Sequence, residues 1–237
     1  MLNAENITIR RSPERGHIHH GWLDSFHTFS FGDYEDPRHM GFRTLRVINE
    51  DTVDPGEGFG AHPHRDMEIV TYVISGALEH KDSMGHGSVI QPGDVQKFSA
   101  GTGVVHSEYN ASKTEKVHFL QIWIVPEKKG IKPAYDQLTI GDLKEDNGLT
   151  LFASYTETPG AIRMHQDVRI YRGILKKGQN RPFTMKDGRG LWFQMIKGAL
   201  EIGGQKAEAG DGIAIERTSS IMMKAVTDTE FLLFDLK

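Results

Sequence analysis

Hydrophobic and polar residues alternate in short runs along most of the chain, the pattern of β-strands with one buried face. Examples in the first half are "RTLRVINE", "EIVTYVISG" and "KVHFLQIWIVP". The second half continues in the same style with "VRIYRGIL", "DGIAIE" and "EFLLFDL". These runs are rich in β-branched and aromatic residues and are separated by Gly, Pro, Asp and Asn, which favours a β-sandwich or barrel. We expect only one short helix, around residues 140–146.

The chain also contains a coarse internal repeat. A strand that runs into "ISGALEH" and is followed by "QPGDV" has a counterpart in "IKGALEI" followed by "EAGDG". Two copies of one β unit indicate two similar small barrels. Between them, "PEKKGIKPAYDQ" has the Lys-, Gly- and Pro-rich composition of a linker. We therefore expect an all-β chain of two domains, covering residues 1–135 and 136–237.

Composition narrows the chemistry that such a chain can carry. Its formal net charge of −4 argues against direct binding to nucleic acid, because a basic surface supplies most of that affinity. The absence of cysteine excludes disulfides, thiolate-zinc sites, iron–sulfur clusters and a cysteine nucleophile. The first residues lack the apolar core of a signal peptide, and no apolar run approaches the ~18 residues of a membrane span. We expect a cytoplasmic protein without membrane association.

Histidine is the most unevenly distributed residue type. Of the 12 histidines, 11 lie within the first 118 residues, so if both halves are the same barrel, only the first carries imidazole chemistry. The cluster "GHIHH" near the N-terminus offers a possible second site, but we expect its members to make ordinary hydrogen bonds. We expect the same of five further histidines, satisfied by backbone groups in the core or on the surface: His27, His39, His80, His86 and His118.

Two pairs of side chains in the first half have the spacing of metal ligands. In "GAHPHRDMEI", His62 and His64 are two residues apart, so their imidazoles lie on one face of an extended segment. Glu68 continues that face if the strand stays regular. In "GTGVVHSEYN", His106 and Glu108 form a second pair with the same spacing. On neighbouring strands, the two pairs would bring three nitrogens and one carboxylate together, whereas the first pair alone would suggest only a solvated loop.

These stretches resemble the two sequence motifs of the cupins. The segment "GEGFGAHPHRDME" is similar to the first motif and "GTGVVHSEYN" to the second, although Gly101 stands where the second motif usually has proline. More specifically, "HTFSFGDYEDPRHMGFRTLRVINED", "FGAHPHRDMEIVTYVISGALEHKDSMG" and "AGTGVVHSEYN" resemble the pirin family of bicupins. The resemblance is strongest to the bacterial pirin-like proteins with quercetinase activity. It runs from about residue 15 to residue 126 and is weaker after residue 136.

The resemblance implies a bicupin of two jelly-roll-like β-barrels, with one metal in the N-terminal cupin and a degenerate, metal-free C-terminal cupin. The family's ligands fall on His62, His64, His106 and Glu108. Other cupins use the glutamate at the position of Glu68, which stays an alternative ligand or a group that supports the ligands. Three imidazoles and one carboxylate suit a single divalent transition metal. We expect Fe(II), with Mn, Co, Ni, Cu and Zn as alternatives.

The family resemblance also implies a function. Four protein ligands on an octahedral ion leave two positions, which a substrate oxygen and O₂ can occupy. The expected activity is that of a metal-dependent dioxygenase, an oxidoreductase of the quercetin 2,3-dioxygenase type that opens the ring of a small flavonol-like aromatic substrate, with Glu108 as the catalytic base. The alternative is a pirin-like metal-binding regulatory module that binds a partner protein without turnover.

Overall fold

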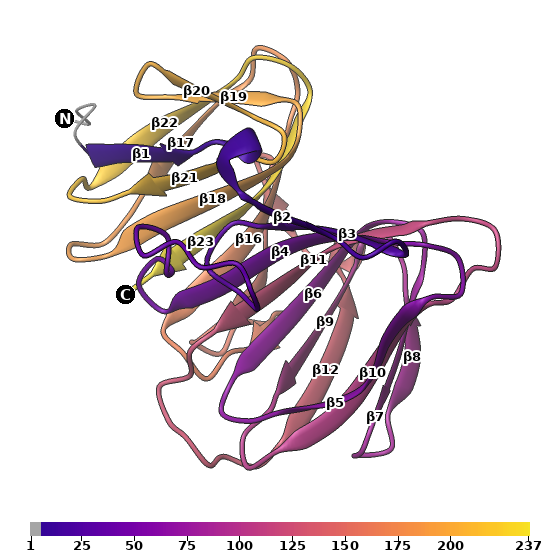
Figure 1. The fold of residues 1–237 in the computed structure, drawn as a ribbon. Helices are drawn as coiled ribbons and strands as arrows, with labels where there is room; N and C mark the ends of the chain where they lie inside the picture. The colour runs from indigo at the N-terminus through magenta and orange to yellow at the C-terminus, as the bar shows by residue number, and fades with distance from the viewer. Residues whose placement is uncertain (1–5) are drawn as a thin grey trace. The chain divides into compact units, whose positions relative to one another are not determined.

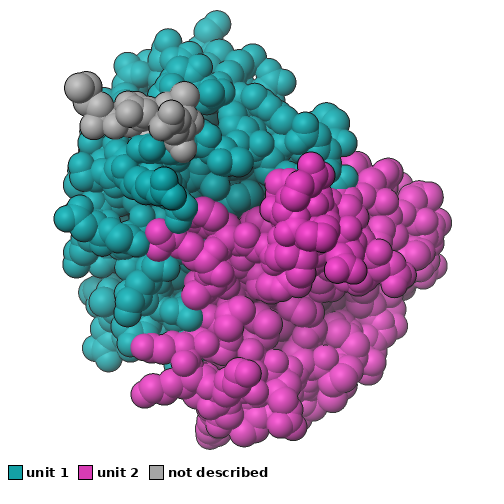
Figure 2. All heavy atoms as spheres, turned by 60° about the vertical axis from the view of Figure 1, so that its left-hand side comes forward, with its two compact units in different colours: residues 1–15, 143–237 teal, residues 16–142 magenta. Residues whose placement is uncertain are grey.

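The structure is a computed structural model that describes residues 6–237. The chain folds as two compact units (Figure 2). Unit 2 comprises Gly16–Asp142, and unit 1 combines Leu143–Lys237 with the described residues up to Arg15. Each unit consists of one large and one small β-sheet, so the predicted all-β class is confirmed. No helix among the described residues is long and apolar enough to cross a membrane.

Unit 2 contains an antiparallel seven-stranded sheet and an antiparallel four-stranded sheet (Figure 1). The larger sheet consists, in spatial order, of β12 (Ala134–Thr139), β9 (Asp94–Ser99), β6 (Glu68–Ser75), β11 (Val117–Ile124), β4 (Leu45–Val53), β3 (Leu23–His27) and β2 (Gly16–His19). The smaller sheet consists of β5 (Gly58–His64), β10 (Val104–Asn110), β7 (Leu78–Asp82) and β8 (Gly87–Ile90).

The hydrophobic core of unit 2 lies between these two sheets. Alternate residues of a strand point to the same face, so each sheet directs one set of side chains inward. One buried cluster combines residues of both sheets: Leu23, Val53, Val73, Val117 and Phe119 from the larger, Leu78 and Ile90 from the smaller. Burial of a side chain of this size contributes roughly 1.5–3 kcal/mol. The space between the sheets is therefore mostly apolar, and polar side chains that enter it need partners.

Unit 1 repeats the arrangement of a large and a small sheet. The larger contains β1 (Ile7–Arg10), β21 (Gly212–Ile215), β18 (Gly190–Lys197), β23 (Thr229–Leu236), β16 (Val168–Leu175), β14 (Leu149–Ser154) and β13 (Glu145–Asp146), with β15 (Ile162–Arg163) parallel to β14. The smaller contains β17 (Asn180–Thr184), β22 (Ser220–Ala225), β19 (Ala199–Ile202) and β20 (Gln205–Glu208). Two turns of 3₁₀-helix, η2 (Ser12–Glu14) and η3 (Ile140–Asp142), complete the regular structure of the described residues.

The repeat noticed in the sequence corresponds to the same turn in both units. "ISGALEH" joins β6 to β7, and "IKGALEI" joins β18 to β19. Gly76 and Gly198 occupy equivalent positions in these turns, with φ of 79° and 77°. Only glycine adopts this region at little cost, and a Cβ at Gly76 would lie 2.5 Å from the carbonyl oxygen of Lys116. The two turns therefore share a structural reason for their shared sequence.

The compact units differ from the predicted domains at both ends. β1 pairs with β21, so that Ile7 lies opposite Ile215, and the first strand belongs to unit 1 rather than to the first domain. The expected boundary after residue 135 falls inside β12, which pairs with β9 as an edge strand of unit 2. Likewise, the segment expected to be a helix forms only η3 followed by β13. A polar, Lys-rich composition fits an edge strand as well as a linker.

Candidate metal centre

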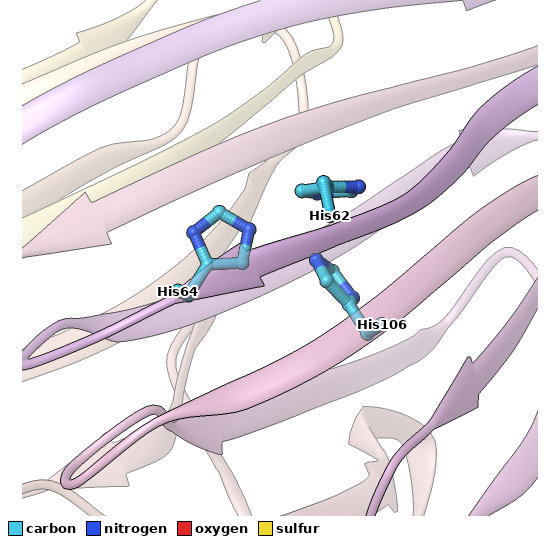
Figure 3. A group of neighbouring side chains, drawn as sticks. All are labelled: His62, His64 and His106. Atoms are coloured by element: carbon cyan, nitrogen blue, oxygen red, sulfur yellow. The ribbon is translucent and has the colours of Figure 1, made fainter.

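Three imidazoles converge between strands β5 and β10 (Figure 3). β5 is an edge strand, which accommodates Pro63, and His62 and His64 project from it on the same side. His106 on β10 lies directly opposite His62. The ring centroid of His106 is 4.4 Å from that of His62 and 4.8 Å from that of His64. One nitrogen of each ring lies within 4.8 Å of the other two, so the sequence spacing correctly placed these three side chains together.

Glu108 lies inside the same barrel, two residues beyond His106 on β10. It is only 2% exposed. Its Oε2 accepts a hydrogen bond of 2.7 Å from Gln121 Nε2, and its Oε1 accepts one of 3.2 Å from Gln96 Nε2. One of its carboxylate oxygens, a nitrogen of His106 and a nitrogen of His80 lie within 4.8 Å of one another. Glu108 is therefore held at the imidazole cluster by two amides of the larger sheet.

The two glutamines are fixed in the orientation that this carboxylate needs. Thr71 lies directly opposite both of them across neighbouring strands. Its hydroxyl donates to Gln121 Oε1 at 3.0 Å, which turns that amide's nitrogen toward Glu108. The hydroxyl of Tyr135 lies 3.3 Å from Gln96 Oε1 and 2.9 Å from Gln137 Oε1, and can donate to either. Such a satisfied polar network holds its members rigidly in a buried site.

A second histidine and an aspartate orient His106 through its Nδ1. His80 Nε2 lies 3.2 Å from Asp82 Oδ2, and His80 Nδ1 lies 3.4 Å from His106 Nδ1. If His80 donates from Nε2 to the carboxylate, its Nδ1 accepts the proton of His106 Nδ1. The Nε2 of His106 then carries a lone pair, and this buried atom has no hydrogen-bond partner among the described residues. A buried, unpartnered imidazole nitrogen fits the role of a metal ligand.

The other two imidazoles also have surroundings that suit metal binding. His62 Nδ1 lies 2.7 Å from the carbonyl oxygen of Gly60 and donates to it, so Nε2 is the nitrogen available to a metal. Burial and the neighbouring imidazoles lower the pKa of His106 to about 2. Burial and His62 lower the pKa of His64 to about 4. Both rings are therefore neutral at pH 7, as metal binding requires.

Comparison with known proteins identifies the family. The pirin family model matches residues 8–124, and the model of the quercetinase C-terminal cupin domain matches residues 151–236. The chain is 48% identical to the quercetin 2,3-dioxygenase of Escherichia coli K12 over 230 residues, which cover 97% of this chain and 98% of that protein.

The chain belongs to the pirin family.

Solved structures agree with this assignment. The crystal structure of the bacterial pirin YhhW from Escherichia coli in complex with nickel(II) superposes with a TM-score of 0.93 at 47% identity, covering 97% of this chain and 98% of that chain. GK1651 from Geobacillus kaustophilus, at 24% identity and a TM-score of 0.81, shares the fold. The predicted bicupin architecture is confirmed, since two cupin barrels lie in one pirin chain.

Glu68 lies away from the imidazoles in this pirin. Residues 65–67 separate β5 from β6, and Asp66 has a left-handed φ of 50° that breaks the extended register. On β6, Glu68 points to the face opposite that of Thr71. Its Oε2 lies 3.3 Å from Lys97 Nζ, and both side chains are almost fully buried. The assumption of a regular strand was therefore wrong, and neither cluster of potential metal-ligating groups includes Glu68.

Glu68→Gln is expected to weaken the fold while leaving metal binding intact. The substitution leaves Lys97 buried with only Asp136, at 3.7 Å and half-exposed, as a charged partner. Removing one partner of a buried pair typically costs about 3 kcal/mol. Denaturant unfolding and metal analysis of the same preparation measure the two quantities. A loss of metal without loss of stability would instead make Glu68 a ligand.

The imidazoles face a cavity of about 320 Å³ inside unit 2. His62, His64 and Glu108 all line it. Four aromatic side chains give it flat apolar walls: Trp22, Phe31, Phe59 and Trp123. The volume is at the lower end of the ~300–1,000 Å³ that is usual for small-molecule sites. The arrangement can hold a flat aromatic molecule with one edge against the imidazoles.

Sequence reasoning missed several residues of this centre. Gln96 and Gln121 each interrupt an otherwise buried strand, and a polar residue on a buried face is the signal that could have found them. His80 was expected to be satisfied by a backbone group, but it instead connects Asp82 to His106. In the N-terminal cluster, His17 Nε2 lies 2.6 Å from Asp24 Oδ1, whereas His20 lines the cavity.

A second buried carboxylate, Asp51, makes stability depend on pH. Burial raises its pKa from 3.8 to about 7, although the hydroxyl of Ser25 donates to it. Between these values, native Asp51 keeps a proton that the unfolded chain has lost, so its contribution to stability falls as pH rises. In the metal-free protein, the free energy of unfolding of Asp51→Asn relative to wild type should therefore rise by about 2–4 kcal/mol between pH 4 and pH 7.5. Denaturant unfolding at several pH values measures this; a pH-independent difference would contradict it.

Proposed function

We propose that the chain is a metal-dependent dioxygenase of the quercetin 2,3-dioxygenase type. The observation that carries the proposal is the convergence of three imidazoles at an aromatic cavity, with a buried carboxylate within reach of one of them, His106. The metal would be held by His62, His64, His106 and Glu108. The name of the Escherichia coli relative and the nickel(II) bound to YhhW support both the activity and the presence of one transition metal.

The donor set fits a divalent ion, and we favour Fe(II). Three neutral imidazoles and one carboxylate leave a net charge of +1 on the centre, which attracts an enolate oxygen. When bound, such an ion would supply a Lewis acid for that oxygen and a site for O₂. Nitrogen and oxygen ligands also suit Mn, Co, Ni, Cu and Zn, so availability decides occupancy.

The residues of this chain would contribute proton transfer and positioning. Burial, together with the charge of Asp51, raises the pKa of Glu108 to about 7 against the opposing hydrogen bond from Gln121. A bound cation would lower this pKa and favour the carboxylate form, which can accept the proton of a flavonol 3-hydroxyl. Gln96 and Gln121 would hold it in place. The overall reaction consumes one flavonol and one O₂ and yields the ring-opened ester and carbon monoxide.

Metal analysis and O₂ uptake on one untagged preparation test this function. One equivalent of metal per chain is expected, and removing it should abolish O₂ uptake with flavonols. Restoring Fe(II) should return O₂ uptake together with release of carbon monoxide, and turnover should stop under argon. If the protein binds metal but no restored metal gives O₂ uptake with a panel of flavonols, the dioxygenase proposal fails. That outcome would favour a regulatory module that binds a partner protein.

A further inference from the structure

The cavity has a polar strip that, apart from Gln121, the proposed chemistry does not use. It lies on the larger sheet, whereas the imidazoles lie on the smaller one. Asp51 on β4 lies opposite Ser25 on β3, and Asn49 lies between His27 and Gln121 on the two neighbouring strands. Directly opposite residues of antiparallel strands share a face. All five side chains line the cavity.

Asn49 leaves one buried acceptor of this strip unsatisfied. Its side chain is only 4% exposed, and its Oδ1 has no hydrogen-bond partner among the described residues. Leaving such an acceptor buried and unpaired costs about 1–3 kcal/mol. Asn49 lines the cavity, so a molecule in the cavity can supply the missing donor. This is the position of a binding group rather than of a structural one.

Asp51 offers a second polar group two residues further along the same face. It is also 4% exposed. One of its carboxylate oxygens accepts the hydroxyl proton of Ser25. A carboxylate oxygen offers more than one acceptor site, so Asp51 keeps capacity for a ligand. Together, Asn49 and Asp51 present acceptors at neighbouring positions, which suits a ligand with two hydroxyl groups.

The walls beside the strip select for a flat ring. Trp22 and Phe59 pack edge to face with ring centroids 5.3 Å apart, and Phe31 and Trp123 do so at 5.2 Å. Paired rings of this kind are held rigidly and offer aromatic surface to a planar ligand. The cavity thus combines flat apolar walls with hydroxyl acceptors. A phenol with several hydroxyl groups matches both.

We propose that Asn49 and Asp51 determine substrate specificity by binding phenolic hydroxyl groups away from the reacting oxygen, so that the site prefers polyhydroxylated aromatics. The inference rests on the proposed function and deepens it by naming the substrate class. A site built to bind a substrate hydroxyl discriminates against the analogue that lacks it, because its own polar groups are then left unpaired. Asn49 and Asp51 would act on the affinity for the substrate, so affinity rather than turnover is the decisive measurement.

Three flavonols that differ only in the pendant ring test this inference: galangin, kaempferol and quercetin, with none, one and two hydroxyls there. Their affinities are measured under argon with metal-loaded protein, and O₂ uptake is measured in air on the same samples. In wild type, each hydroxyl is expected to improve affinity about 5-fold. Asn49→Leu should remove one of these two affinity steps, that is, the gain in affinity from one of the two hydroxyls. Asn49→Leu/Asp51→Leu should remove both, while galangin affinity stays within about 2-fold because it has no pendant hydroxyl to lose.

Glu50→Gln is the matched control. Glu50 lies between the two residues on β4 and points to the other face of the sheet, where its Oε1 is 2.9 Å from His118 Nε2. It should keep both affinity steps. If O₂ uptake occurs but Asn49→Leu, checked for an intact fold by circular dichroism, keeps both steps, the inference fails and the dioxygenase stands. If binding depends on the hydroxyl groups but no O₂ uptake occurs, the inference stands and the dioxygenase proposal fails. If no flavonol binds, both the inference and the dioxygenase proposal fail.

Discussion

His106→Ala is expected to abolish metal binding and turnover together. The substitution removes the imidazole whose buried Nε2 has no protein partner and leaves His80 and Asp82 with nothing to orient. Loss of one of four ligands should weaken metal binding at least ~100-fold, because even supporting groups cost ~10–100-fold. Metal content after dialysis and O₂ uptake with quercetin measure the two losses. Both should fall to background.

Two further variants keep this result interpretable. His106 is 2% exposed, so its truncation also leaves a cavity that lowers stability. His62 lies on the edge strand β5 and is only partly buried, so His62→Ala should lose metal with a smaller loss of stability. His17→Ala, which removes a half-exposed histidine, should keep both metal and activity. Unchanged metal content in folded His106→Ala would disprove the proposed ligand set.

Local periodicity explains why the sequence predicted part of this centre. Residues two apart on a strand share a face whatever the strand's neighbours are, so His62 and His64 could be placed together without a structure. The same reasoning failed for Glu68, because it assumed that one strand continues through residues 65–67. The left-handed backbone at Asp66 ends that strand, and the next one belongs to the other sheet. A single residue outside the extended region therefore separates Glu68, the alternative ligand, from the face of His62 and His64.

Long-range pairing explains what the sequence could not predict. Alternation indicated most strands correctly, but it does not show which strands become neighbours. Ile7 lies opposite Ile215, and nothing local to the first ten residues indicates a partner so distant in the chain. Likewise, Gln96 and Gln121 reach Glu108 only because β9 and β11 both flank β6. The proposed metal ligands follow from motifs, whereas the groups that hold them depend on topology.

The structure adds contacts that bear on the role expected for Glu108. On sequence grounds it was preferred to Glu68 only by family resemblance. In the structure it is the carboxylate within reach of His106, and the amides of Gln96 and Gln121 donate to it. Burial raises its pKa to about 7 in the metal-free protein, and a bound cation would favour the charged carboxylate. These contacts support the proposal that Glu108 serves as a ligand and as a base.

Glu108→Gln is expected to lower turnover by about 10³-fold even when the protein is saturated with metal. Removing a general base typically costs ~10²–10⁴-fold. The new amide would also turn an NH₂ group toward the donors of Gln96 or Gln121, which face the carboxylate at 3.2 Å and 2.7 Å. Metal affinity should fall as well, so O₂ uptake has to be measured at increasing metal concentrations until it no longer changes.

The shape of this titration separates the two roles of Glu108. If the carboxylate is only a ligand, saturating metal should restore most of the activity of Glu108→Gln. If it is also the base, activity stays low at saturation, and Glu108→Asp, which keeps the charge on a shorter side chain, should recover part of it. Glu79→Gln on the neighbouring β7 removes an exposed carboxylate that pairs with Lys81 and should behave like wild type. Wild-type turnover in metal-saturated Glu108→Gln would show that another group takes the substrate proton, and the buried Asp51 in the same cavity would be the next to test.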